Sequence, residues 1–216
     1  MPLSTVLGAQ SLIKPGVCTT ATRPSSPYTG QLIYDTTVSQ TLVWNGSAWA
    51  IDSGGLIYIT TLGLNGATVD FQGCFTSAYT DYRAIFNYTV ASANAVYLRY
   101  LVGSTVQTTT IFSLSTGNQQ SVPNTFSGSA RSDQFALWAT GYPTYPTVVT
   151  CDFLSPQVAA YTNYMYSFVT GLSATDFFAG HGYGRNAATT QIDGFQLYTG
   201  SPTITGTMTL YGYRKA

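Results

Sequence analysis

Charged residues are scarce in this chain of 216 residues. Only 7% of them are charged, whereas a soluble domain usually carries about 25%. Eight Lys and Arg residues balance eight acids, so the formal net charge is zero, and every acid is an Asp. A protein that grips a nucleic-acid backbone needs clustered Lys and Arg. We therefore expect no nucleic-acid partner.

Long apolar runs are missing as well. No stretch approaches the roughly 18 consecutive apolar residues of a membrane-spanning helix, so we expect no membrane partner. The N-terminal residues Met1–Ser4 have neither the basic nor the apolar region of a secretory signal. We therefore expect no secretion, and cysteines that are reduced in the cytoplasm in which the chain is made and assembled.

The low charge also bears on the surface of the protein. A surface with few charges and no net charge favours association over solubility. A subunit packed beside copies of itself, or on a larger particle, needs less charge than a free protein. The composition thus favours a component of an assembly, and we expect a homo-oligomer.

Metal ligands and nucleophiles are few. The three cysteines are Cys18, Cys74 and Cys151, and their spacing matches no zinc pattern. We interpret them as reduced, mostly buried apolar residues. The single histidine, His181, lies in the sequence GHGYGR at residues 180–185. This stretch lacks the strand-then-helix context of a phosphate-binding loop, and we interpret it as a flexible loop.

No catalytic cluster can be recognised. A glycosidase needs two positioned carboxylates, but the Asp residues are scattered, and Asp in β-proteins is mostly a turn residue. A Ser or Cys nucleophile would need His181 as its base, and no GxSxG elbow is present. We predict that the protein is not an enzyme and has no catalytic residue, no metal site and no cofactor. The Asp residues are Asp35, Asp52, Asp70, Asp81, Asp133, Asp152, Asp176 and Asp193.

Strand-forming residues dominate what is present. Aromatic residues make up 14% of the chain, including 17 Tyr, and hydrophobic residues make up 44%. Tyr, Thr, Val, Ile and Phe favour strands, whereas the Glu and Lys that favour helices are absent or rare. This composition predicts an all-β protein, and no segment has a sustained helical period.

The first 54 residues are expected to form a separate small unit. Residues 1–22 are interpreted as an extended arm, and residues 31–35, 41–44 and 47–51 as a three-stranded meander. Asn45-Gly46 predicts a tight type I′ hairpin turn. The meander would place Tyr34, Trp44 and Trp49 on neighbouring strands. Such a small sheet is marginal alone and needs a surface to rest on. A boundary is predicted at residues 52–55.

Residues 55–216 show the pattern of an antiparallel β-sandwich, and we expect it to be jelly-roll-like. The clearest alternation is in residues 82–90, where period two indicates a half-buried strand. Asn65-Gly66 predicts another tight turn, and residues 115–131 are interpreted as a long polar loop. Residues 141–146, with two Pro and two Tyr, predict a surface loop. About eight strands separated by turn signals are expected in this domain.

Two stretches of the small unit resemble a module found in structural proteins of tailed bacteriophages. They are RPSSPYTGQLIYD at residues 23–35 and TLVWNGSAW at residues 41–49. More loosely, GTMTLYG at residues 206–212 resembles the closing strand of phage virion β-sandwich proteins, and residues 81–87 with Leu98-Arg99 resemble their early strands. The resemblance implies a virion structural protein, with partner-binding residues in the module. These are Pro24, Pro27, Tyr28, Tyr34, Trp44 and Trp49.

The resemblance leaves two locations open. The favoured hypothesis is a capsid decoration or cement protein on the head surface. It would dock on the major capsid protein or other virion subunits through the arm and meander, as a homo-oligomer, with a trimer favoured. Burial of apolar area over many copies would tie neighbouring capsomers together. The chain lacks the coiled-coil or repetitive shaft that is usual in fibres.

The alternative is a tail-fibre or receptor-binding component that contacts host glycans. Its outer-surface contacts would be Tyr142, Tyr145, His181 and Tyr183, because aromatic faces stack on sugars. The same tyrosines could instead pack against neighbouring subunits.

Overall fold

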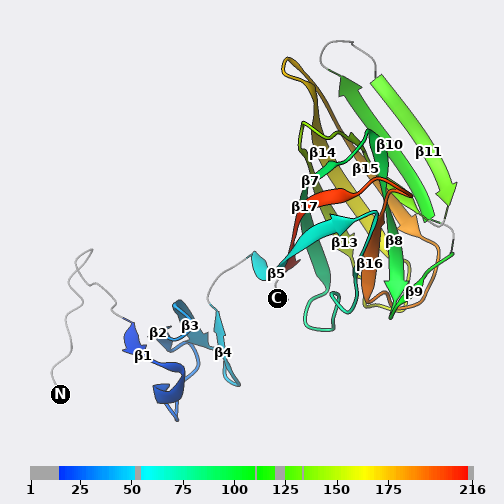
Figure 1. Cartoon of the computed structure of the whole chain (residues 1–216). Coiled ribbons are helices and arrows are strands. Elements are labelled where there is room, and N and C mark those ends of the chain that lie inside the picture. Colours follow the sequence, from blue (N-terminus) through cyan, green and yellow to red (C-terminus); the bar gives the residue numbers. More distant parts are fainter. Residues whose placement is uncertain (1–14, 52–54, 110, 120–124, 133, 214–216) are drawn as a thin grey trace, which may run out of the picture. The chain divides into compact units, whose positions relative to one another are not determined.

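The computed structural model describes residues 15–51, 55–109, 111–119, 125–132 and 134–213. The chain divides into two compact units, Met1–Gly54 and Gly55–Ala216, and each is a β-structure in its own right (Figure 1). The described residues contain no α-helix, only one 3-10 turn at Thr20–Thr22. The predicted all-β fold class is therefore confirmed.

The small unit is a four-stranded sheet in the order β1-β2-β3-β4. The predicted meander corresponds to β2, β3 and β4, while β1 pairs in parallel with β2. The expectation of an extended arm is wrong for β1, because its backbone joins the sheet; residues 1–14 of the arm lie outside the described residues. The strands are β1 (Gly16–Cys18), β2 (Leu32–Asp35), β3 (Gln40–Trp44) and β4 (Trp49–Ile51).

The turn at Asn45-Gly46 is not the predicted two-residue hairpin. Trp44 pairs with Trp49, so four residues lie between the strands. Gly46 has a positive φ of 101°, but Asn45 does not, which excludes a type I′ turn. The Asn45 side-chain oxygen instead accepts hydrogen bonds from the backbone N–H groups of Ser47 and Ala48, at 3.0 and 2.8 Å. Asn acts here through its side chain rather than its backbone.

The large unit is an antiparallel sandwich of an eight-stranded and a five-stranded sheet. The larger sheet has the order β11-β10-β15-β14-β13-β7-β17-β5. Its strands are β5 (Leu56–Gly66), β7 (Asp81–Val90), β10 (Ile111–Gln119), β11 (Thr125–Ser132), β13 (Thr147–Leu154), β14 (Asn163–Ser173), β15 (Asp176–Asn186) and β17 (Ile204–Tyr213). The smaller sheet has β6 (Thr68–Phe71), β8 (Asn94–Val102), β9 (Thr105–Val106), β12 (Phe135–Gly141) and β16 (Gly194–Tyr198).

Two predicted loops of this unit are strands instead. The predicted loop at residues 115–131 contains most of β10 and β11, which pair with each other. The predicted loop at residues 180–185 lies inside β15, between β10 and β14. The expected number of strands was therefore too low. Asn65-Gly66 ends β5, and after the single residue Ala67 the chain enters β6 of the smaller sheet.

Aromatic side chains fill the core between the two sheets. Phe75 contacts Tyr82, Phe153 and Phe195 with ring centroids 4.8, 5.0 and 5.6 Å apart. Phe153 and Phe195 come from opposite sheets and stack at 5.2 Å. The Tyr82 hydroxyl accepts a hydrogen bond from the Thr76 N–H and donates one to the Thr76 carbonyl. The phenol thus fixes the loop before β7 while its ring fills the core.

Candidate interaction surfaces

Glycines in β15 allow large rings to lie flat on the inner face of the larger sheet. Tyr164, Tyr166 and Phe168 of β14 pair with Gly184, Gly182 and Gly180 of β15, respectively. A Cβ on Gly182 would lie 2.5 Å from the Tyr166 ring. The three rings form a ladder, with centroids 6.4 Å apart at each step. Rings that cover cross-strand glycines are a known way to hold such strands in register.

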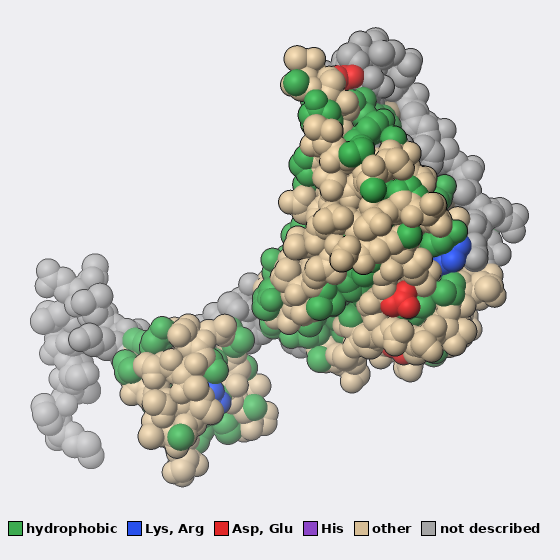
Figure 2. All heavy atoms as spheres, viewed as in Figure 1, with side chains coloured by type: hydrophobic (Ala, Val, Ile, Leu, Met, Phe, Trp, Pro, Cys, Tyr) green, Lys and Arg blue, Asp and Glu red, His purple; other side chains and the backbone are tan. Residues whose placement is uncertain are grey.

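Because glycines occupy the inner face of β15, the intervening side chains point to the outer face. His181 and Tyr183 lie there, and Tyr183 is 48% exposed. Both residues were predicted to be outer-surface contacts within a flexible loop. They lie instead on strand β15 of the larger sheet. Charged side chains are isolated patches on the face seen in Figure 2, where green and tan atoms dominate.

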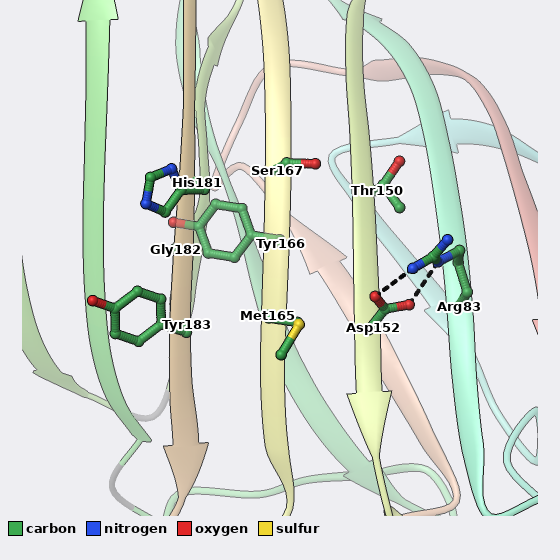
Figure 3. A pocket seen from close by; sticks show the side chains of 9 residues that line it. All are labelled: Arg83, Thr150, Asp152, Met165, Tyr166, Ser167, His181, Gly182 and Tyr183. Atoms are coloured by element: carbon green, nitrogen blue, oxygen red, sulfur yellow. Dashed lines mark hydrogen bonds and ion pairs between the residues drawn. The ribbon is translucent and has the colours of Figure 1, made fainter.

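A shallow hollow of about 330 Å³ lies on the outer face of the larger sheet. It crosses four adjacent strands, β7, β13, β14 and β15 (Figure 3). Its lining residues are Arg83, Thr150, Asp152, Met165, Tyr166, Ser167, His181, Gly182 and Tyr183. Sequence reasoning found only two of them, because the others come together only through strand register.

The side chains of the hollow lie in two rows across the strands. One row is Arg83, Asp152, Met165 and Tyr183, and the next is Thr150, Ser167 and His181. Arg83 donates from Nε to Asp152 Oδ1 and from Nη2 to Oδ2, both at 2.7 Å. The Tyr213 hydroxyl also donates to Oδ1, at 2.8 Å. The Arg83 charge is therefore neutralised within the site.

The electrostatics of this ion pair follow from these contacts. The Asp152 carboxylate raises the pKa of Arg83 above its usual value, so Arg83 stays charged. Burial and the hydrogen bond to Asp152 raise the pKa of Tyr213 to about 12. Both groups thus hold their protons at neutral pH and keep the pair fixed.

The two tyrosines of the predicted surface loop are less available than expected. Tyr142 and Tyr145 are both half-buried. The Tyr145 ring covers Gly171, where a Cβ would lie 2.8 Å from the Tyr145 Cβ. The Tyr142 carbonyl accepts a hydrogen bond from the Val90 N–H at 3.3 Å. Tyr145 thus packs on its own chain.

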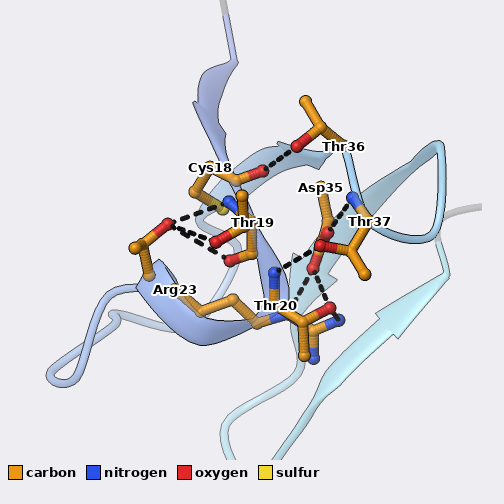
Figure 4. Close-up of polar contacts among 8 residues, drawn as sticks. Cys18, Thr19, Thr20, Arg23, Asp35, Thr36 and Thr37 are labelled. Carbon is orange, nitrogen blue, oxygen red and sulfur yellow. Dashed lines mark hydrogen bonds and ion pairs between the residues drawn. The ribbon is translucent and has the colours of Figure 1, made fainter.

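The small unit holds a buried carboxylate at one end of the segment RPSSPYTGQLIYD (Figure 4). Asp35 is fully buried, and its Oδ2 accepts hydrogen bonds from Arg23 Nε at 2.7 Å and Thr20 Oγ1 at 2.9 Å. Its Oδ1 accepts one from the Thr37 N–H at 2.8 Å. Burial alone would raise the pKa of Asp35, but these hydrogen bonds outweigh it and hold the pKa below its usual value.

One face of the small sheet is apolar and accessible. Val17, Tyr34 and Thr41 form one row across it, and Leu32, Val43 and Ala50 form the next. Val17 is 72% exposed and Tyr34 is 37% exposed. The opposite face carries the buried Ile33 and Leu42.

The six predicted partner-binding residues lie in different places on the small unit. Tyr34 lies on the accessible face, and Tyr28 is 71% exposed in the loop before β2. Trp44 and Trp49 form an edge-to-face pair at 5.5 Å and are half-buried on the same side as Leu42. Pro24 and Pro27 are half-buried. The structure therefore does not bring all six residues onto one surface.

Potential metal ligands are dispersed over the described part of the chain. It contains no group of three His, Cys, Asp or Glu side chains that could hold a metal ion. The carboxylates of Asp70, Asp81 and Asp193 each accept a hydrogen bond from Gln196, Ser155 or Gly103, respectively. Cys18, Cys74 and Cys151 are free of disulfides, and burial raises the pKa of Cys74 to about 12.

Among the described residues, no helix has the length and apolar character required to cross a membrane. No protein-family model, no curated protein and no solved structure matches this chain.

Proposed function

We propose that this chain is a non-enzymatic structural protein of a tailed-bacteriophage particle, a capsid decoration protein that attaches through residues 15–51. The observation that carries the proposal is the accessible apolar face of the small sheet. Val17, Leu32 and Tyr34 lie on that face, and the last two belong to the segment that resembles phage structural proteins. Burial of this face against a virion subunit would supply the surface that a sheet of this size needs.

The weakly charged surface of the large unit supports the same role. Decoration places many copies side by side on one shell, where low charge reduces repulsion between neighbours. The exposed apolar side chains on the outer face of the larger sheet fit contacts between such copies. They are Leu114, Met165, Val169, Phe177 and Tyr183. A homo-oligomer, with a trimer favoured, remains part of the proposal.

A tail component that contacts host glycans is the second candidate. The specific observation in its favour is the hollow that holds His181 and Tyr183 on the outer face of the larger sheet. A hollow with exposed polar and aromatic groups is more useful for recognition than for attachment to a shell.

Immunogold labelling of intact particles tests the location. Label spread over the head is the expected result, whereas label confined to the tail would favour the second candidate. Particles without label at either place would overturn the proposal of a virion protein.

A matched pair of substitutions tests attachment. Val17→Ser removes an apolar contact from the accessible face, while Val38→Ser changes a 46% exposed Val in the turn between β2 and β3. We expect Val17→Ser to reduce the amount of protein recovered on purified particles and Val38→Ser to leave it unchanged. Equal recovery of both variants would argue against docking through this face.

A further inference from the structure

The hollow on the larger sheet has hydrogen-bonding groups without partners. Thr150 Oγ1, Ser167 Oγ and the His181 ring make no hydrogen bond with any other described residue. They share one row on three adjacent strands, about 4.8 Å apart. The Arg83 Nη1 group next to this row is also free of Asp152, which bonds only Nε and Nη2 (Figure 3).

The neighbouring row is apolar at its end on β14 and β15, beyond the Arg83–Asp152 ion pair. Met165 and Tyr183 are 49% and 48% exposed, and they pair with each other across β14 and β15. A ligand in the hollow would thus meet hydroxyl and imidazole groups on one side, and a thioether and a phenol ring on the other. It would have to combine hydrogen-bonding groups with an apolar surface.

The charge of the site narrows the ligand class. The bidentate ion pair cancels the charges of Arg83 and Asp152, and Tyr213 occupies a further site on Oδ1. Asp152 is thus poorly placed to pair with a cation, and Arg83 is already paired. The site complements an uncharged ligand.

We propose that this hollow binds a neutral saccharide. A sugar ring carries hydroxyls at its edge and C–H groups on its faces, so it matches a polar row beside an aromatic and thioether row. Sugar rings are about as wide as one strand spacing, and a linear oligosaccharide lying across the strands would present one unit to each of Thr150, Ser167 and His181. The inference deepens the second candidate function and rests on it for its biological setting.

The single histidine of the chain gives a direct test. Full-length protein labelled with ¹⁵N is titrated with neutral hexasaccharides of glucose, mannose or N-acetylglucosamine, and the imidazole signals of His181 are followed by NMR. The expected result is a saturable shift with at least one of them.

Three variants and one control assign the shift to the hollow. Thr150→Val and Ser167→Ala each remove one hydroxyl and should raise Kd about five- to tenfold. Tyr183→Ala removes the ring and should raise Kd about tenfold. Thr207→Val changes an exposed Thr on β17 outside the hollow and should leave Kd unchanged. Amide spectra confirm that each variant is folded.

Three outcomes would overturn the inference. The first is no shift with any of the sugars at millimolar concentration. The second is an equal loss of binding in Thr207→Val. The third is a His181 shift that depends on protein concentration instead of sugar concentration, together with a dimer in sedimentation that Met165→Glu abolishes. A second copy of the chain would then occupy the hollow. Since the test uses the isolated chain, its failure is separate from a failure to find label on particles.

Discussion

Arg23 Nε lies 2.7 Å from Asp35 Oδ2, and these two residues are the first and last of the segment RPSSPYTGQLIYD. The Arg23 side chain is 25% exposed and that of Asp35 is fully buried. The ion pair thus closes the long loop before β2 onto the end of that strand. The two ends of this segment therefore have a structural role, because they hold the small sheet together.

The first prediction concerns the loss of this ion pair. Asp35→Ala should unfold residues 15–51, because it leaves Arg23, Thr20 Oγ1 and the Thr37 N–H without their common acceptor. NMR amide signals of the small unit should collapse while those of residues 55–213 persist. Asp70→Ala is the control, because Asp70 is exposed and accepts one hydrogen bond from Gln196. Retention of the small-unit signals in Asp35→Ala would contradict this role.

The second prediction concerns acid. The folded pKa of Asp35 is below its usual value of 3.8 because hydrogen bonds favour the charged form more than burial disfavours it. A lowered folded pKa stabilises the folded unit above pH 3.8, and that contribution is lost as the pH falls through the folded pKa. Amide signals of residues 15–51 should therefore disappear below pH 3.8 before those of the large unit. Simultaneous loss of both sets would count against this explanation.

The third prediction concerns the ladder of β14 rings that covers the glycines of β15. Gly182→Ala should destabilise the large unit by about 1–3 kcal/mol, because the new methyl group overlaps the Tyr166 ring. Gly63→Ala is the matched control, since nothing lies within 4 Å of a Cβ there. Urea unfolding measures both variants. A double-mutant cycle with Tyr166→Ala should show coupling, and strict additivity would mean that the ring and the glycine are independent.

Sequence patterns located strands best where one face is buried and the other is not. Tyr82 to Val90 alternate in sequence, and β7 alternates in burial over the same residues. The same rule failed for β15, because the inward-facing residues are Gly180, Gly182 and Gly184, which are typical of loops. The apolar surface that covers them comes from rings on β14, so it is invisible within the β15 sequence.

The candidate site was less accessible to sequence reasoning than the fold class. Arg83 and Asp152 are 69 residues apart in sequence and meet only through the pairing of β7 with β13. His181 and Tyr183 were identified as outer-surface residues, but Thr150 and Ser167 are ordinary residues in any β-protein. Only the register of four strands shows that they share one hollow.

The last prediction concerns alkaline pH and Tyr213. Burial and the hydrogen bond to Asp152 raise the pKa of Tyr213 from 10.0 to about 12. A raised folded pKa stabilises the protein fully below pH 10.0, and this contribution is lost as the pH rises toward 12. Tyr213→Phe should cost about 1 kcal/mol of unfolding free energy at neutral pH, because the hydrogen bond to Asp152 is lost.

Because the chain has 17 tyrosines, the difference between the two proteins is the informative quantity. The gap in unfolding free energy between wild type and Tyr213→Phe should narrow as the pH rises from 10.0 to 12, since the wild-type phenol loses the proton that it donates to Asp152. Tyr28→Phe is the matched control, because Tyr28 is 71% exposed, and its gap should stay near zero at every pH. A gap for Tyr213→Phe that does not change with pH would contradict this explanation, because Phe keeps a ring over Arg83 and lacks only the hydroxyl.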